Sequence, residues 1–271
     1  MMEMPLVSII MGVYNEEDCL QRCIDSILGQ TYKNWEFIIC DDCSTDSTAK
    51  ILEDYKKKDS RIVVLRNEKN SRLAKSLNNC LEIAHGDYIA RMDADDISLP
   101  NRLSTQVGFM LNNPQIDCVG TSRIMFDEDG DRGMRVEIEK PTKYTLLHGN
   151  PFAHPTIMIK KEVLNELGGY RVRPETMRAE DLDLWFRFFE KGFVGYNIQE
   201  PLYKYHESLT DLKKRTLKAA FGISKVYYQG YKALGFPRYT YFRALKPLMA
   251  AIIPPKIMAM HYRRSEKAVL K

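Results

Sequence analysis

The segment LVSIIMGV at residues 6–13 decides the fold, because a mostly apolar run between turn residues is typical of a strand buried on both faces of a sheet. The amphipathic pattern at 16–28 predicts a helix, since its apolar side chains recur on one face. Strand-like and helical patterns then alternate at 35–40, 44–55, 62–65, 73–84 and 88–92. Right-handed crossovers join such strands, so residues 1–100 predict a mainly parallel sheet flanked by helices.

Residues 101–212 follow a less regular α+β pattern that we expect to complete the sheet and cover its edge. Helical patterns lie at 100–111, 161–167 and 181–191, and strand-like segments lie at 117–126, 135–138 and 156–159. A turn at Asp129-Gly130 separates the first two of these strand-like segments. The remaining segment, 213–271, is helical in pattern and is interrupted by Pro237, Pro247 and Pro254-Pro255.

The charge of the chain is divided unequally along its length. The 271 residues have a formal net charge of +4 and are 44% apolar, which is typical of a folded protein with a sizeable core. Segment 213–271 contains 14 Lys and Arg against the single acid Glu266, a net of +13, so residues 1–212 carry −9. A basic segment of this kind predicts contact with a polyanion, either nucleic acid or a membrane surface.

Composition also predicts the compartment. No basic leader precedes the first strand-like segment, and no apolar run reaches the roughly 18 residues that a membrane-spanning helix requires. Six cysteines are scattered through a chain too large to need disulfides, which favours a reducing environment. We therefore expect a cytoplasmic protein.

Three polar clusters follow strands of the expected sheet. They are Gly12 to Asn15 after the first strand, Asp41-Asp42 after the second, and Asp93 to Asp96 after the fourth. Ligands of an open parallel sheet bind beyond the carboxyl ends of its strands, so these clusters are expected to share one crevice. A solvated turn or a helix cap is the ordinary alternative for any one cluster alone, and three at successive strand ends favour a site.

The residue types in these clusters are suited to a nucleotide bound with a metal. Asp93 and Asp95 are suited to a divalent cation whose other ligands are diphosphate oxygens. Asp42 is suited to hydrogen bonds from a base or ribose, and Tyr14 to stacking on the base. Neither of the glycine-rich phosphate loops, GxGxxG after the first strand or GxxxxGK[ST], is present in the sequence.

Five ordered motifs resemble those of the inverting family 2 glycosyltransferases of the GT-A fold. They are VSIIMGVYN (7–15), SILGQTY (26–32), DDCSTD (41–46), RMDADD (91–96) and AEDLDLW (179–185). The resemblance covers residues 5–210, and HPT (154–156) and GGY (168–170) are similar to the bacterial branch that builds lipopolysaccharide and capsule glycans. It implies a Rossmann-like α/β catalytic domain over 1–212 with a mixed, mainly parallel sheet.

That domain would comprise a nucleotide-binding half, 1–100, and an acceptor half, 101–212, followed by a basic helical extension, 213–271. The resemblance implies that the donor is a nucleotide sugar, with UDP-hexose or UDP-N-acetylhexosamine as the leading candidates. It assigns the nucleotide to Gly12, Val13, Tyr14, Asn15, Asp42, Asn67 and Asp93. It also assigns Mg²⁺ or Mn²⁺ to Asp95, with Asp93 reaching the metal or the ribose.

The same resemblance makes Asp181 the general base that accepts the proton of the acceptor hydroxyl, in a single displacement with inversion. Glu180 is the rival base, and an acidic residue that complements a helix dipole is the alternative role for Asp181. Lys204, His206 and Ser208 stand where many relatives have an Arg-x-His element that closes over the diphosphate. Lysine in place of arginine retains a point charge but loses bidentate recognition.

Two further patterns of the sequence leave alternatives open. The dense aromatic residues at 185–189 suit a core better than a sugar platform. In segment 213–271, basic residues mixed with aromatic and apolar ones favour an anionic membrane surface near a lipid-linked or other saccharide acceptor, without nucleic acid. A helical cap on the body is the alternative packing, and a non-catalytic nucleotide-sugar binder or a nucleic-acid binder is the alternative function.

Overall fold

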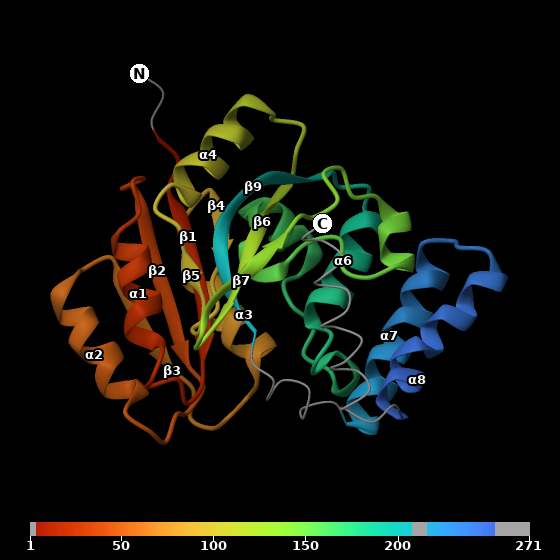
Figure 1. Cartoon of the computed structure of the whole chain (residues 1–271), viewed down its shortest axis with the longest axis horizontal. Helices are drawn as coiled ribbons and strands as arrows, with labels where there is room; N and C mark the ends of the chain where they lie inside the picture. The colour runs from red at the N-terminus through yellow and green to blue at the C-terminus, as the bar shows by residue number, and fades with distance from the viewer. Residues whose placement is uncertain (1–3, 208–215, 253–271) are drawn as a thin grey trace.

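The computed structural model describes residues 4–207 and 216–252, and a nine-stranded sheet runs through its centre (Figure 1). The strands are β1 Val7–Val13, β2 Trp35–Asp41, β3 Ile62–Arg66, β4 Tyr88–Arg91, β5 Ile97–Ser98, β6 Cys118–Asp127, β7 Gly130–Arg135, β8 Met158–Lys160 and β9 Gly195–His206. Their order in the sheet is β3-β2-β1-β4-β8-β6-β9-β5, and β7 pairs with β6. The mixed α/β architecture expected from the sequence is confirmed.

Eight α-helices and four short 3₁₀ helices surround the described part of the sheet. The α-helices are α1 Leu20–Leu28, α2 Thr48–Lys58, α3 Leu73–Ile83, α4 Arg102–Asn112, α5 Lys161–Leu167, α6 Glu180–Glu190, α7 Leu217–Ala233 and α8 Lys246–Ile252. The 3₁₀ helices are η1 Lys143–Leu147, η2 His154–Thr156, η3 Pro174–Thr176 and η5 Arg238–Leu245. No described helix is long and apolar enough to cross a membrane.

Parallel pairing brings the ends of β1 and β2 together. β1 pairs with β2 in the register Val7↔Trp35 to Val13↔Asp41, and on its other edge with β4 from Val7↔Tyr88. All three strands therefore point their carboxyl ends in one direction, as parallel pairing requires. The loops that follow them, which contain the predicted polar clusters, leave the sheet at the same edge.

Alternate residues of β1 enter two different cores. Val7, Ile9 and Met11 pack with α1 and α4, whereas Ile10 faces α3 and belongs to a cluster that continues through α5 and α6. A side-chain period of two places consecutive residues on opposite faces of a sheet, so the apolar run at 6–13 serves both layers.

The second half of the sheet corrects one expectation from the sequence. The strand expected at 135–138 is wrong, because the chain turns at 128–129 and β7 occupies Gly130–Arg135. A two-residue connection returns the chain into pairing at once, so β7 ends where the expected strand begins. Val136 and Ile138, which suggested that strand, are exposed.

Strand β9 is the longest of the described strands and was not anticipated. It pairs in parallel with β6 and in antiparallel with β5, and its register shifts near Pro201. The proline and the irregular register interrupt the alternation by which a strand is recognised in a sequence.

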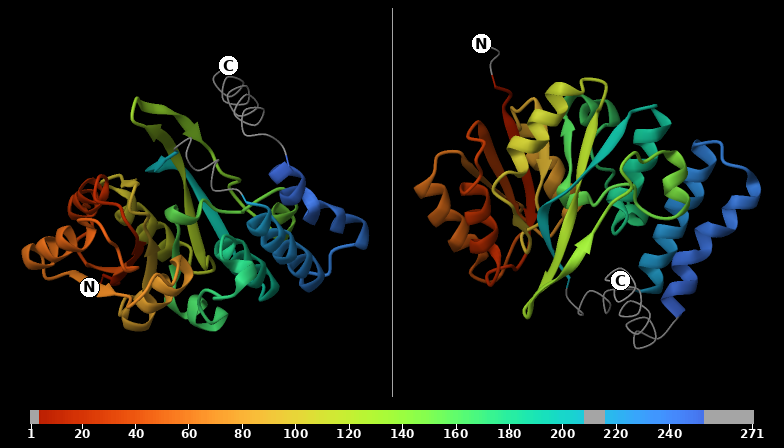
Figure 2. Two further views of the ribbon diagram at one scale, coloured as in Figure 1. Left: turned by 90° about the horizontal axis from the view of Figure 1, so that it is seen from below. Right: turned by 45° about the horizontal axis from the view of Figure 1, so that its top comes forward.

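The described part of the C-terminal segment packs on the body. Helix α7 lies against α6, with α8 beside it, at the end of the molecule remote from α1 and α2 (Figures 1 and 2). Val226 and Tyr231 of α7 join the same core cluster as Phe186 of α6. Pro247 does not interrupt a helix, because it lies in the first turn of α8, where proline is tolerated.

Helix α7 approaches α6 through a glycine, and this contact yields a prediction. A Cβ at position 230 would lie 2.2 Å from Phe186 Cγ, whereas a Cβ at Gly108 in α4 would meet nothing within 4 Å. We expect Gly230→Ala to destabilise the protein by about 1–3 kcal/mol through overpacking. Gly108→Ala should stabilise it by about 0.5–1 kcal/mol through helix propensity. Urea unfolding of both variants measures this, and a stabilised Gly230→Ala protein would contradict the packing of α7 on α6.

Candidate active site

The loop after β1 is held against the loop after β2. Asn15 adopts a left-handed backbone conformation with φ of 54°, its N–H donates to Ser44 Oγ at 3.1 Å, and its Oδ1 accepts from the Thr45 N–H at 2.9 Å. Asparagine tolerates this conformation better than most residues. The loop therefore has a defined shape, with Tyr14 43% exposed beside it.

Gly12 and Val13 contribute backbone rather than side-chain chemistry to this loop. A Cβ at position 12 would lie 3.0 Å from Leu73 Cδ1 and from Ser76 Cβ, so glycine lets α3 pack closely on β1. Val13 is buried in the core.

Asp42 and Asn67, both expected near a nucleotide base, are in direct contact. Asn67 Nδ2 donates to Asp42 Oδ1 at 2.7 Å. The N–H groups of Ser71 and Arg72, which precede α3, donate to Asp42 Oδ1 at 2.7 Å and Oδ2 at 2.8 Å. Asp42 thus joins the second strand end to the N-terminal end of α3, which favours a carboxylate there.

The acidic run after β4 carries three carboxylates in close proximity. Asp93 forms an ion pair with Arg91, a buried residue, and Asp95 Oδ2 lies 3.5 Å from His206 Nδ1. Asp96 is buried and accepts from the His206 N–H at 2.7 Å, which ties the end of β9 to this run. Burial and the charge of Asp93 raise the pKa of both Asp95 and Asp96.

Lys204, unlike His206, pairs with an acidic residue outside this cluster. Lys204 Nζ contacts both carboxylate oxygens of Asp131 on β7 at 2.8 Å. Its ammonium is therefore engaged with the β6–β7 hairpin. Ser208 lies outside the described residues.

A cavity of about 420 Å³ contains the other predicted residues. It is lined by Asp93, Glu180 and Asp181, together with Arg91 and Asn150. Leu73, which follows the Asp42-bound N–H of Arg72, also lines it. Asp42, Asn67, Asp95 and His206 lie outside this lining, so the cavity contains only some of the residues predicted to bind the nucleotide, the metal or the diphosphate.

Asp181 is held by two donors at the N-terminal end of α6. Its Oδ1 accepts from the Leu182 N–H at 2.7 Å and its Oδ2 from Asn150 Nδ2 at 2.5 Å. Burial raises the pKa of Asp181, while these donors and the charge of Arg91 oppose the rise. These hydrogen bonds fix the orientation of the Asp181 carboxylate at the cavity, which Asn150 also lines.

The pKa of Glu180, the neighbour of Asp181, is also raised. Burial, followed by the charge of Asp181, raises it from 4.5 to about 8. Burial thus favours the protonated form of Glu180, whereas the two hydrogen-bond donors favour the charged form of Asp181.

Arg91 and Asn150 are among the lining residues that were not predicted as site residues, and only Arg91 left a signal in the sequence. Arg91 is an arginine at the end of a buried strand, an unusual position for that residue, and this anomaly was open to notice. Asn150 lies in an irregular segment, 31 residues from its partner Asp181, and no pattern indicates the pairing.

Packing gives structural roles to Asp183 and to the aromatic residues of α6. Asp183 pairs with Arg187 Nε at 2.8 Å and Arg171 at 3.3 Å, so it is a structural carboxylate. Trp185, Phe186 and Phe188 are buried in the core, as expected.

Within 4–207 and 216–252, no group of three or more His, Cys, Asp or Glu side chains is placed to hold a metal ion.

The chain resembles several known proteins in sequence and in fold. The profile of the family described as "Glycosyl transferase family 2" matches residues 8–168. EpsE of Bacillus subtilis, whose name describes a glycosyltransferase, is 45% identical over 96% of this chain and 94% of its own length. The Escherichia coli "UDP-Glc:alpha-D-GlcNAc-diphosphoundecaprenol beta-1,3-glucosyltransferase WfaP" is 32% identical over 78% of this chain and 82% of its own. The structure of S. aureus TarS 1-349 in complex with UDP shares the fold, with a TM-score of 0.64, 20% identity and coverage of 96% and 87%.

The raised pKa of Glu180 predicts a pH-dependent cost to stability. The folded protein binds more protons than the unfolded chain between pH 4.5 and about 8, so stability falls as pH rises through this window. Glu180→Gln removes that cost. We expect the melting temperature of the variant to exceed that of the parent by about 2–4 °C at pH 8 and by little at pH 5.

Glu190→Gln, at the exposed far end of α6, is the matched control and should show no such trend. An equal difference for Glu180→Gln at both pH values would contradict the raised pKa.

Proposed function

The chain belongs to glycosyl transferase family 2, and on this premise we propose that it moves a sugar from a nucleoside diphosphate donor to a glycan or lipid-linked saccharide in bacterial surface polysaccharide synthesis. A UDP-hexose or UDP-N-acetylhexosamine is the proposed donor. The name of WfaP, a relative over most of the chain, supports both a UDP-sugar and a diphospholipid-linked acceptor.

The observation that carries this proposal is the placement of Asp93 and Asp181 on one cavity. These residues come from motifs nearly ninety positions apart, one beside the proposed nucleotide site and one on α6. Sugar transfer requires the donor's anomeric carbon and the acceptor hydroxyl to be held in line. The cavity has Asp93, beside the proposed nucleotide site, and Asp181, the proposed base, in its lining, and so it meets that requirement.

We assign the nucleotide to the loops after β1 and β2. Asp42 retains acceptor capacity on Oδ2, which has one hydrogen-bond donor, and Asn67 holds it in place. The rigid backbone from Gly12 to Asn15 lies beside it, with Tyr14 exposed for stacking. Asp93, at the cavity edge, would reach the ribose.

We assign a divalent cation, Mg²⁺ or Mn²⁺, to the residues after β4. Asp95 would be its principal ligand, with Asp93 nearby and His206 Nδ1 3.5 Å from Asp95. Burial and the charge of Asp93 raise the pKa of Asp95, so a bound cation would favour its charged form. When bound, the metal would offset negative charge on the departing diphosphate. Lys204 and Ser208 remain candidates for diphosphate or acceptor contacts, with Lys204 paired to Asp131.

Asp181 is the proposed general base. It accepts the proton of the acceptor hydroxyl as that oxygen bonds to the anomeric carbon and the bond from this carbon to the diphosphate oxygen breaks. One displacement of this kind inverts the anomeric configuration. The raised pKa of Glu180 favours its protonated form, which supports Asp181 over Glu180 as the base.

Replacement of Asp181 tests this assignment. Asp181→Asn keeps the shape and removes the proton acceptor, so we expect kcat to fall by about 10²–10⁴-fold. Transfer is measured with a panel of UDP-sugars in Mg²⁺ or Mn²⁺, with UDP affinity as the check on folding. Glu180→Gln is the matched control, expected to retain activity within about tenfold. Near-normal turnover by a folded Asp181→Asn protein would exclude the role.

We also propose that the C-terminal helices lie on the anionic inner face of the membrane. Six basic residues and no acidic ones occur between 216 and 252. Exposed apolar side chains accompany them on α7, η5 and α8: Leu217, Phe221, Tyr228, Tyr239, Phe242, Leu245, Met249 and Ile252. Basic and apolar groups together are typical of an interfacial segment.

Flotation with vesicles tests this proposal by substitution rather than by truncation, because removal of α7 would open the core. The full chain should float with vesicles containing phosphatidylglycerol and less with neutral ones. Phe221→Ser combined with Phe242→Ser should reduce flotation several-fold, since each side chain is about two-thirds exposed. Leu111→Ser on α4 is the control, and equal flotation of all three proteins would refute the proposal.

A further inference from the structure

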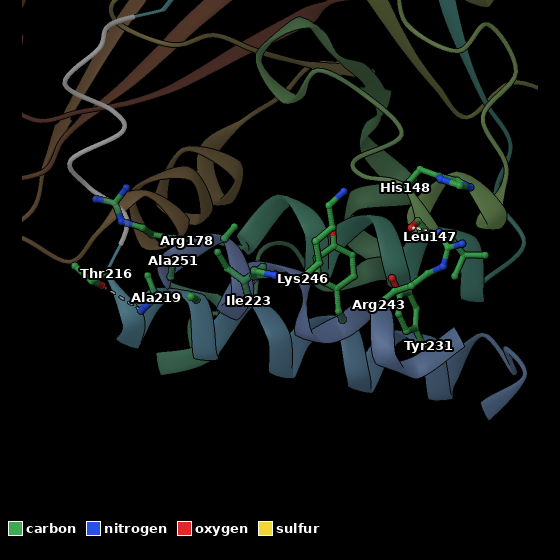
Figure 3. Close-up of a pocket in the computed structure, with 14 residues that line it drawn as sticks. Leu147, His148, Arg178, Thr216, Ala219, Ile223, Tyr231, Arg243, Lys246 and Ala251 are labelled. Carbon is green, nitrogen blue, oxygen red and sulfur yellow. Dashed lines mark hydrogen bonds between the residues drawn. The ribbon is translucent and has the colours of Figure 1, made fainter. Parts of the chain in front are cut away.

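A second cavity, of about 520 Å³, lies between α7, α8 and the segments that lead to Asn150 and α6 (Figure 3). Its walls are mostly apolar, with Ile223 and Tyr231 from α7 and Pro247 and Ala251 from α8. Tyr231, one of these lining residues, donates its Oη–H to the Leu146 carbonyl at 3.4 Å. The mostly apolar lining suits a hydrocarbon chain better than a sugar.

The charged groups that line this cavity are all basic. They are Arg178, Arg243 and Lys246, accompanied by His148, and none of the described lining residues is acidic. No ion pair joins these arginines or this lysine to any described carboxylate, and Arg243 donates only to the Leu147 carbonyl at 3.3 Å. Figure 3 places Arg178 near Thr216 and Ala251, and Arg243 near Leu147 and Tyr231. Cations that have no ion-pair partner among the described residues and that surround an apolar space are complementary to an amphiphile with an anionic head group.

Two short segments connect this cavity to Asp181. Leu147 and His148 line it, and Asn150, two residues on, lines the first cavity and donates to Asp181. Arg178 lines it, and Glu180, again two residues on, lines the first cavity. Three residues of extended chain span at most about 10 Å, so Arg178 and Asp181 are neighbours on the scale of a saccharide. The second cavity therefore adjoins the acceptor side of the proposed site, opposite the nucleotide loops.

We propose that this cavity binds the lipid diphosphate of the acceptor, with the first isoprenoid units against α7 and α8 and the diphosphate on Arg178 and Lys246. The attached saccharide would then extend past Arg178 toward Asp181. This inference rests on the proposed transfer to a lipid-linked saccharide, and it assigns the C-terminal helices a role in recognition of that acceptor.

Calorimetry with farnesyl diphosphate tests the assignment on the full chain, without a donor or a reaction. Farnesyl diphosphate should bind at least about tenfold more tightly than either farnesol or inorganic diphosphate, because the cavity uses both parts. Saturating UDP should not displace it. Equal binding of inorganic diphosphate, or displacement by UDP, would overturn the proposal.

Two variants locate the binding. Arg178→Gln with Lys246→Gln should weaken it about tenfold or more, because charge-assisted contacts are lost. Ala219→Trp should fill the cavity and abolish it. The matched controls are Lys218→Gln with Lys232→Gln, and Ala233→Trp, on α7 but outside the lining. Unchanged affinity in both test variants would overturn the proposal. If Ala219→Trp does not fold, the variant with Arg178→Gln and Lys246→Gln decides the test, because both of its substituted side chains are exposed.

Kinetics separate this proposal from the proposed function. The charge variant should raise KM for a farnesyl-diphosphate-linked saccharide about tenfold, with kcat and the KM for a soluble glycoside unchanged. Cavity-dependent binding by a chain that transfers no sugar would refute only the function. Transfer to the lipid-linked acceptor with unaltered kinetics in the charge variant would refute only the cavity assignment.

Discussion

The buried guanidinium of Arg91 is the interaction on which the proposed site depends. It ends β4 in a position 3% exposed, forms an ion pair with Asp93, and lines the cavity that Glu180 and Asp181 also line. Without a fixed cation, these carboxylates would repel one another across a partly desolvated space. Its charge lowers the pKa of Asp181 against the effect of burial, and thereby favours an ionised base. One arginine thus couples a strand of the first half of the chain to a helix of the second.

The same core that positions α6 also receives the C-terminal helices. Phe186 and Trp185 bury one side of α6, while Asp181 at its N-terminal end remains on the cavity. Because α7 packs on Phe186 through Gly230, α7 is part of the scaffold behind Asp181, the proposed base. A helical cap and a membrane-facing segment were opposed alternatives in the sequence, yet an inner apolar face packed on the body and an outer exposed one coexist here.

The fold of residues 1–100 was largely predictable because the sequence patterns that indicate it are local. The apolar run at 6–13, the alternating helices and the polar strand ends all follow from side-chain period and turn chemistry, and parallel pairing then brings the strand ends to one edge. The acceptor half was less predictable. Its long strand β9 carries Pro201 and a register shift, and β7 begins directly after a two-residue turn, so neither presents a clear alternating pattern. The boundary between 212 and 213 stays a prediction, since it falls outside the described residues.

The sequence by itself determined which chemistry is available: carboxylates after the strands, an acidic pair at the start of a helix, and a basic, apolar C-terminal segment. Those properties depend on residue type and short-range period. Only the tertiary structure decided which groups meet. It placed Asn150 on Asp181, His206 beside Asp95 and Lys204 on Asp131, and it formed a cationic, apolar cavity beside the segments that lead to Asn150 and Asp181. Such contacts join residues far apart in the chain, and they depend on how the helices and strands pack, which no local pattern specifies.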